Sequence, residues 1–183
     1  MSAIKFLLSR QSNGFLAEPG PSPEQLKSIF ATAMAVPDHA GLNPYKFHQI
    51  EGDGLTKLTN IYVDAIKAIT NDEFKIAKAE KMAYRAPLLI VVSTDYKKHP
   101  KVPEQEQLVT AGCAAHAVQM ASTALGFGSM WRTGDVAYSN IVKKGLGISA
   151  NNDIVGFIYI GSKSKELPNK TRKTADDFIE IWQ

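Results

Sequence analysis

The run Leu88-Leu-Ile-Val-Val-Ser93 constrains the fold more than any other stretch of the chain. A strand that faces water on one side alternates apolar and polar residues, whereas a strand buried on both faces is apolar throughout. The run therefore predicts an interior strand that is covered on both faces. Stretches at 47–51, 129–132 and 154–160 are also predicted to be strands.

Other stretches carry apolar residues at helical spacing. The clearest helix start is at Ser22, which can cap the helix, with Pro23 in the first position and Gln25 completing a capping box. A long helix is predicted at about 104–125. The side chains in its middle, 111–115, are so small that another element must approach the helix closely there. The remaining predicted helices are 2–10, 23–35, 55–69, 72–84 and 138–146.

Composition limits the class of protein. A chain of 183 residues with 44% hydrophobic and 21% charged residues is typical of one soluble globular domain, so we expect a single domain over residues 1–183. The net charge of +3 is too small to indicate a nucleic-acid partner. No apolar run approaches the roughly 20 residues needed to cross a bilayer, and the N-terminus has no signal-peptide pattern. We expect a cytoplasmic protein that binds neither membrane nor nucleic acid.

The single cysteine, Cys113, excludes an internal disulfide and any multi-cysteine metal site. Cys113 and His116 lie one turn apart in the predicted long helix, but two such ligands without a second pair make a poor metal site. We therefore expect a core cysteine, a core histidine and no bound metal.

The C-terminal stretch is polar and rich in lysine over 162–174, and then ends in Phe178-Ile-Glu-Ile-Trp182. The basic part lacks the interleaved aromatic residues that favour RNA binding. The apolar end predicts a docking tail, and the sequence leaves open whether it docks on a partner subunit or on its own core.

Three separated segments indicate a common site: Arg10-Gln-Ser12, Ala35-Val-Pro-Asp-His-Ala-Gly-Leu-Asn-Pro44 and Gly128-Ser-Met-Trp-Arg-Thr-Gly134. In this order and separation they resemble the nitroreductase superfamily, from about residue 4 to residue 172. The resemblance implies an α+β, nitroreductase-like fold with a central mixed, mostly antiparallel sheet flanked by helices. It also implies a homodimer with an exchanged C-terminal tail, FMN as cofactor, NADH or NADPH as hydride donor, and a small electron-poor acceptor such as a nitroaromatic or a quinone.

The resemblance also assigns site residues. Those implied to bind FMN are Arg10, Gln11, Ser12, Ala35, Pro37, His39, Asn43, Trp131, Arg132 and Thr133. Those implied to contact the nicotinamide dinucleotide are Ala121, Ser122, Thr123, Ala124, Leu125 and Gly126. No catalytic side chain is assigned, because the flavin carries the redox chemistry.

The two arginines in this set have different possible roles. The guanidinium of Arg10 can bind phosphate oxygens through two hydrogen bonds. Arg132 can serve the phosphate, or it can lie at the N1–C2=O edge of the flavin, where two-electron reduction places negative charge. The sequence leaves both roles open for Arg132.

The sequence differs from the members of the superfamily that it resembles at two places. Many members have another basic residue just after the Arg-x-Ser segment, where this chain has Asn13, Gly14 and Phe15. Close members also tend to have arginine where this chain has Ala35. Two fewer cations near an anionic cofactor leave an alternative open, a non-catalytic flavin-binding or sensor protein that keeps the fold.

Overall fold

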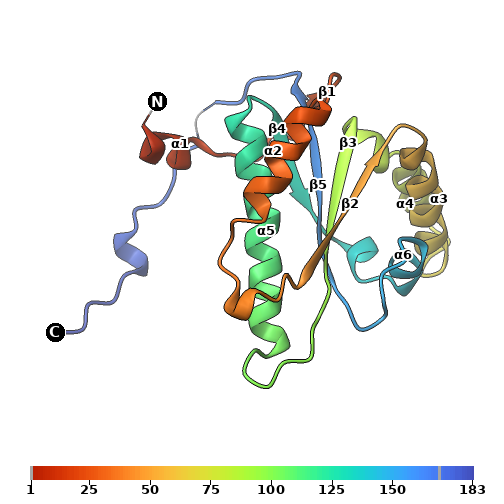
Figure 1. The fold of residues 1–183 in the computed structure, drawn as a ribbon. Helices are drawn as coiled ribbons and strands as arrows, with labels where there is room; N and C mark the ends of the chain where they lie inside the picture. The colour runs from red at the N-terminus through yellow and green to blue at the C-terminus, as the bar shows by residue number, and fades with distance from the viewer. Residues whose placement is uncertain (1, 169) are drawn as a thin grey trace.

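The computed structural model describes residues 2–168 and 170–183, and its centre is a five-stranded antiparallel sheet (Figure 1). Residues 157–160 of the last strand pair with two other strands, so this strand lies between them in the middle of the sheet. The mostly antiparallel sheet that was predicted is confirmed, and every described pairing is antiparallel. The strands are β1 (Leu16–Ala17), β2 (Tyr45–Glu51), β3 (Leu88–Thr94), β4 (Gly128–Arg132) and β5 (Ile154–Lys163), with β5 between β3 and β4.

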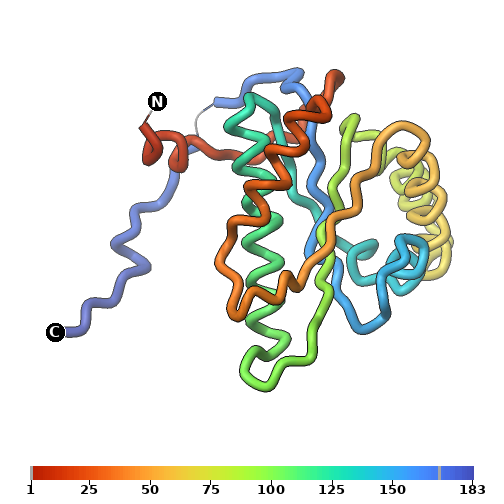
Figure 2. The backbone as a smooth tube through the Cα atoms, in the orientation of Figure 1, coloured from red at the N-terminus to blue at the C-terminus, as the bar shows by residue number. Residues whose placement is uncertain are grey.

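Helices cover both faces of the sheet (Figures 1 and 2). One face carries α2 (Pro23–Ala33) and α5 (Glu104–Ala124), and the other carries α3 (Asp53–Lys67), α4 (Glu73–Glu80) and α6 (Asn140–Gly145). A further helix, α1 (Ala3–Ser9), precedes the first strand, and four short 3-10 turns lie at η1 (His39–Gly41), η2 (Ala83–Arg85), η3 (Asp135–Ala137) and η4 (Asp176–Phe178).

The core forms one layer on each side of the sheet, and β3 contributes to both. All seven of its residues are buried, as the apolar run predicts. Leu89 and Val91 pack toward α3, whereas Ile90 and Val92 pack toward α2 and α5. This alternation follows from the two-residue period of a strand. The side of the sheet on which a residue lies can therefore be derived from its register.

Helix starts agree with the sequence better than helix ends do. The capping box forms as predicted: Ser22 Oγ accepts from Gln25 N at 3.3 Å, and Gln25 Oε1 accepts from Ser22 N at 2.8 Å. However, α2 ends at Ala33, before the predicted residue 35, because the chain turns toward Pro37. The predicted helix over 72–84 is split into α4 and η2, and the predicted 138–146 helix is the shorter α6.

Both ends of the chain leave apolar side chains exposed. Helix α1 buries no residue, and Leu8 on its predicted apolar face is 67% exposed. The last residues run away from the body of the molecule (Figures 1 and 2), and Trp182 is 92% exposed. Within the described chain, the predicted tail therefore does not dock on its own core.

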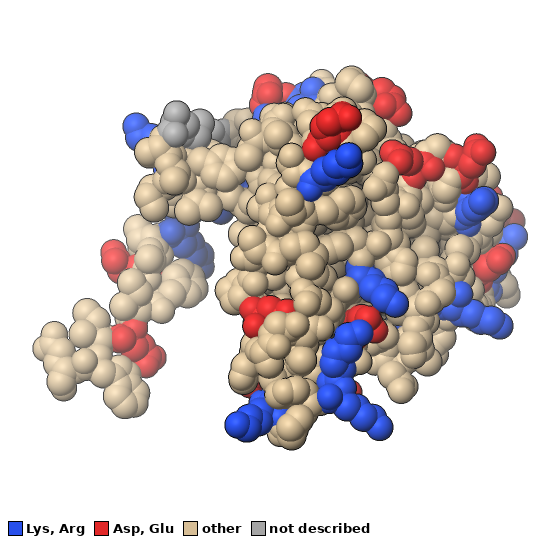
Figure 3. Space-filling view, viewed as in Figure 1, with Lys and Arg blue, Asp and Glu red and all other residues tan. Residues whose placement is uncertain are grey.

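The surface seen in Figure 3 carries lysine and arginine side chains interspersed with carboxylates. None of the helices within residues 2–168 and 170–183 has the length and hydrophobicity needed to cross a bilayer.

Candidate active site

The loop after α1 lies along β4, which brings the first and third predicted motifs together. Asn13 N donates a hydrogen bond to Ser129 O at 2.9 Å. A Cβ added to Gly14 would lie 3.2 Å from Nη2 of Arg132 and from the terminal methyl of Met130. The segment containing Arg10, Gln11 and Ser12 is therefore next to the strand that carries Trp131 and Arg132.

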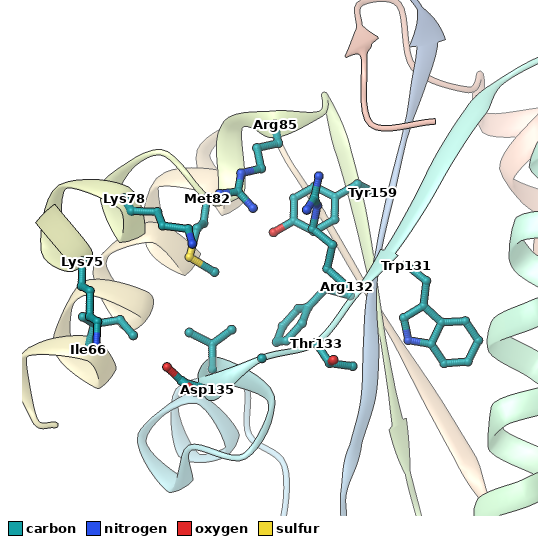
Figure 4. Close-up of a pocket in the computed structure, with 13 residues that line it drawn as sticks. Ile66, Lys75, Lys78, Met82, Arg85, Trp131, Arg132, Thr133, Asp135 and Tyr159 are labelled. Atoms are coloured by element: carbon teal, nitrogen blue, oxygen red, sulfur yellow. The ribbon is translucent and has the colours of Figure 1, made fainter. Parts of the chain in front are cut away.

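The register of β4 places Trp131 and Arg132 on opposite faces of the sheet. Trp131 pairs with Ile158, whose side chain packs toward α5, and Arg132 pairs with Phe157, which packs toward α3. Figure 4 shows the indole of Trp131 on the α5 side and the guanidinium of Arg132 pointing the other way. The indole Nε1 donates to Val155 O at 3.2 Å, which fixes the ring across Gly156.

On the α5 side of β4 lies an open apolar groove of about 640 Å³, between α1, α2 and α5. The groove brings Ala35 and Pro37 of the second motif together with Trp131 of the third. Its other lining residues are Leu7, Thr32, Val36, Val109, Gly112, Cys113, His116, Ala117 and Met120. Residues of the second and third motifs thus lie around this groove, and Leu7 brings the helix before the first motif to it.

Cys113 and His116 line this groove, so the prediction of a core cysteine and a core histidine is wrong. Cys113 is half-buried and His116 is exposed. Both lie on the part of α5 that faces away from the sheet, whereas Ala111, Ala114 and Ala115 take the buried positions. No group of three or more His, Cys, Asp or Glu side chains suited to a metal occurs within the described residues.

His39 and Asn43 do not line the groove in the single chain. His39 Nδ1 lies 2.7 Å from Glu106 Oε2 at the start of α5, and both side chains are largely exposed. The backbone N–H of Asn43 donates to Asp38 Oδ2 at 2.7 Å, and Asn43 itself has a positive φ of 47°. The turn is thus held by its own contacts, and neither residue is among those that line the groove with Trp131.

A basic hollow of about 310 Å³ lies between α1 and the C-terminal stretch, lined by Lys5, Leu8, Ser9, Gln11, Lys170 and Arg172. Arg172 Nη2 donates to the carbonyl oxygen of Arg10, and Gln11 Nε2 donates to Leu167 O at 3.3 Å. The C-terminal stretch therefore adds two cations beside the Arg-x-Ser segment. Lys170 and Arg172 were not predicted to be site residues, because the basic stretch 162–174 carries no local motif that marks a binding site.

On the α3 side of β4 lies a second basic cavity, the basic pocket, of about 490 Å³. Figure 4 shows Arg85 to one side of Tyr159 and the Arg132 guanidinium over its ring, with Lys75 and Lys78 across the pocket. The guanidinium of Arg132 is 5.8 Å from the centre of the Tyr159 ring. The pocket is also lined by Thr133, Gly134, Asp135 and Trp131, and its apolar wall consists of Ile66, Met82, Val136 and Phe157.

The guanidinium of Arg132 does not use all of its hydrogen-bond donors in this pocket. Its Nε is buried and has no hydrogen-bond partner among the described residues. Burial first, and then the charge of Arg85, lower the pKa of the Arg132 guanidinium. A buried N–H donor without a partner favours an incoming acceptor. Arg85 was not predicted from the sequence, because nothing in its local pattern distinguishes it from a solvated arginine.

The six residues implied to contact a nicotinamide form the end of α5 and the turn after it. Ser122 Oγ donates to Val118 O at 2.8 Å, and Thr123 Oγ1 donates to Gln119 O at 2.9 Å, so both hydroxyls are bonded within the helix. Ala121 is buried, whereas Ala124, Leu125 and Gly126 are exposed. None of the six lines the groove, the basic hollow or the basic pocket.

Comparison with known proteins gives consistent matches. A family model described as "Nitroreductase family" matches residues 10–162. A protein of Escherichia coli K12 named "Putative NAD(P)H nitroreductase YdjA" is 40% identical over 162 residues, which cover 88% of each chain. A nitroreductase-like family protein from Bacillus cereus has the same fold, with a TM-score of 0.87, 21% identity, and coverage of 100% of this chain and 97% of that one. A nitroreductase with bound FMN from Bacteroides fragilis has a TM-score of 0.74, 20% identity and coverage of 98% of both chains.

Proposed function

The chain belongs to the nitroreductase family, and on this premise we propose that it is an FMN-dependent oxidoreductase that uses NADH or NADPH to reduce a small electron-poor acceptor, such as a nitroaromatic or a quinone. The names of its relatives support a nicotinamide as donor, and a solved protein of the same fold contains FMN. The observation that carries the proposal is the position of the Arg10–Gly14 loop along β4, with cations gathered on both sides of it.

The residues around this loop fit FMN. Arg10 and Ser12, together with Lys170 and Arg172 of the basic hollow, would hold the phosphate. The orphaned Nε of Arg132 offers a donor to a polar group of the ring system. When bound, FMN supplies the redox chemistry, by accepting a hydride from a nicotinamide and passing the electrons on to an acceptor.

The protein's own part is to bind and orient. Trp131 is a rigid wall, because its indole is held by the Val155 carbonyl and crosses Gly156. The apolar groove beside it can accept flat rings and exclude water. Because the flavin carries the redox chemistry, the proposal assigns no acid or base side chain at the acceptor.

The proposal includes a homodimer with exchanged C-terminal tails. The groove, the exposed face of α1 and the apolar end of the tail are apolar surfaces that a second copy would cover. In such a dimer the turn with His39 and Asn43 would complete the partner's site. We also place the dimer in the cytoplasm, where the lone thiol of Cys113 would stay reduced.

The alternative, a flavin-binding or sensor protein without turnover, drew its support from the missing cations at Gly14 and Ala35. Lys170 and Arg172 lie beside the first motif, and Arg85 lies in the basic pocket with Arg132 of the third, so other segments supply positive charge there. These cations support the enzyme over the alternative near the first and third motifs, whereas the residues that line the groove around Ala35 include no lysine or arginine.

The absorption spectrum of the purified protein tests the proposal. We expect a yellow protein that NADH or NADPH bleaches under anaerobic conditions and that a nitroaromatic reoxidises. Arg10→Ala should release FMN during gel filtration, whereas Lys144→Ala, which removes an exposed cation on α6, should retain it. A protein that cannot be loaded with FMN contradicts the proposal, and a yellow protein that no nicotinamide reduces supports the alternative.

A further inference from the structure

The side chain of Arg132 has few polar contacts that could hold it in place. Among the described residues it takes part in no ion pair, and its buried Nε has no hydrogen-bond partner. A long side chain loses rotamer entropy when it is fixed, so a contact must offset this loss. The face of the Tyr159 ring provides such a contact, with the guanidinium carbon 5.8 Å from the ring centre (Figure 4).

The register of the sheet places this ring within reach of the arginine. Arg132 of β4 pairs with Phe157 of β5, so Tyr159 lies two residues further along β5, on the same face of the sheet and diagonal to Arg132. Diagonal neighbours on antiparallel strands are within reach of long side chains. The contact between Arg132 and Tyr159 therefore follows from the strand pairing.

The ring of Tyr159 is itself fixed. The residue is 1% exposed and belongs to the core cluster on the α3 side of the sheet. At this residue β5 is paired on both sides, with Leu89 of β3 and with Met130 of β4. A ring without freedom of its own can define where a guanidinium on its face lies.

Tyr159 acts on the arginine as a neutral ring. Burial, the largest influence, raises the pKa of the Tyr159 hydroxyl, although the charges of Arg85 and Arg132 oppose this rise. The phenol therefore keeps its proton near neutral pH, and the electron-rich face of the ring attracts the cation. This attraction is stronger where water is excluded, and Arg132 is partly buried.

The guanidinium also lies close to the loop that contains the first motif. A Cβ added to Gly14 would lie 3.2 Å from Arg132 Nη2, which is tighter than ordinary contact. The proposed function places FMN at this loop. The position of the guanidinium on the Tyr159 ring is therefore also a position beside the loop.

We propose that Tyr159 is a positioning residue for FMN binding: the face of its ring holds the Arg132 guanidinium, so that Nε is ready to donate a hydrogen bond to the cofactor. This inference rests on the proposed function and deepens it, because it adds a residue that acts through Arg132. Nothing in the local sequence marks Tyr159, since aromatic residues are common in buried strands.

The dissociation constant of FMN tests this role, measured from the fluorescence of the cofactor that is released when the holoprotein is diluted. Tyr159→Phe keeps the ring and should bind FMN as the wild type does. Tyr159→Leu removes the ring and should weaken FMN binding by roughly three- to tenfold, because FMN must then immobilise a free arginine side chain. The matched control is Leu58→Ala, which opens the same core cluster but does not line the basic pocket. It should lower stability in urea and leave FMN binding unchanged.

A double-mutant cycle separates positioning from packing. Arg132→Ala should weaken FMN binding, and adding Tyr159→Leu to it should weaken binding no further, because the ring then has nothing to position. Solvent exchange of the Arg132 Nε–H, followed by NMR, gives a readout that does not depend on FMN affinity. This exchange should be slow in the wild type and in Tyr159→Phe, and fast in Tyr159→Leu. If Tyr159→Leu does not fold, Tyr159→Met takes its place, because the flexible methionine side chain fills irregular gaps in a core.

The results that overturn the inference are distinct from those that overturn the function. Equal losses of FMN in Tyr159→Phe and Tyr159→Leu would assign the effect to the hydroxyl and not to the ring. Unchanged FMN binding in Tyr159→Leu, or losses that multiply in the double variant, would also overturn the inference while leaving an FMN enzyme in place. A wild-type protein that cannot be loaded with FMN overturns the proposed function, whereas unchanged Nε–H exchange in Tyr159→Leu overturns the positioning of Arg132 by itself.

Discussion

At the scale of single residues, His48 on β2 gives a pH dependence whose sign can be worked out. The ring is half-buried, and its Nε2 lies 3.2 Å from Ser93 Oγ. Burial first, and then the charge of Lys46, lower the pKa of His48. The folded protein therefore binds this proton less readily than the unfolded chain does, and stability that is present above about pH 6.5 is lost as the pH falls further.

We expect His48→Gln to lose less stability than the wild type between pH 7 and pH 5. The glutamine keeps a polar group near Ser93 but takes up no proton in this range. Urea unfolding at several pH values measures the difference. Parallel pH profiles for the two proteins would show that His48 does not contribute.

Gly156 gives a second prediction at this scale. A Cβ at this position would overlap the Trp131 indole, so Gly156→Ala should destabilise the protein by about 1–3 kcal/mol in denaturant unfolding. The matched control is Gly112→Ala on α5, where an added Cβ meets nothing within 4 Å and helix propensity improves. Equal stability of Gly156→Ala and the wild type would contradict the rigid-wall role of Trp131.

The motif residues could be found in the sequence, but their neighbours in space could not. Arg10, Trp131 and Arg132 stand in recognisable local patterns. Arg85 precedes β3 and lies near Arg132 of β4 because both strands pair with β5, and Arg172 joins Arg10 because the chain end returns to α1. Local sequence carries no information about either event.

At the scale of elements, the capping box of α2 can be tested by itself. Ser22→Ala removes the acceptor for Gln25 N and should cost about 1 kcal/mol of stability in urea unfolding. The control is Ser28→Ala in the same helix, whose hydroxyl only bonds back to Glu24 O. Because alanine is the better helix former there, this control should not lose stability. Equal losses in both variants would contradict a specific cap.

Elements with a strong pattern were predicted well, and elements set by tertiary contacts were not. The seven buried residues of β3 and the long helix α5 agree with their predicted ranges within a residue or two. The two-residue strand β1 and the break between α4 and η2 were missed. β1 is too short to show the two-residue alternation of a strand. The turn η2 redirects the chain from α4 into β3, and this change of direction depends on tertiary contacts.

At the scale of the whole molecule, the C-terminal tail makes a testable contribution. It adds no buried residue to the described fold, so a chain truncated after Thr174 should still fold. If tails exchange between copies, truncation should move the protein in light scattering from twice the mass of the 20.0 kDa chain toward that mass. It should also weaken FMN retention. An unchanged mass would contradict the tail exchange.

The half-buried thiol of Cys113 lies in the groove, so its reactivity can report whether two copies have assembled. Cys113 is the single cysteine, so a thiol-reactive dye can label only this side chain. If a second copy closes the groove, the labelling rate should fall as protein concentration rises, and dilution should restore it. The dissociation constant of the dimer could then be obtained without any substitution, from the rate at which the dye labels Cys113 at each protein concentration.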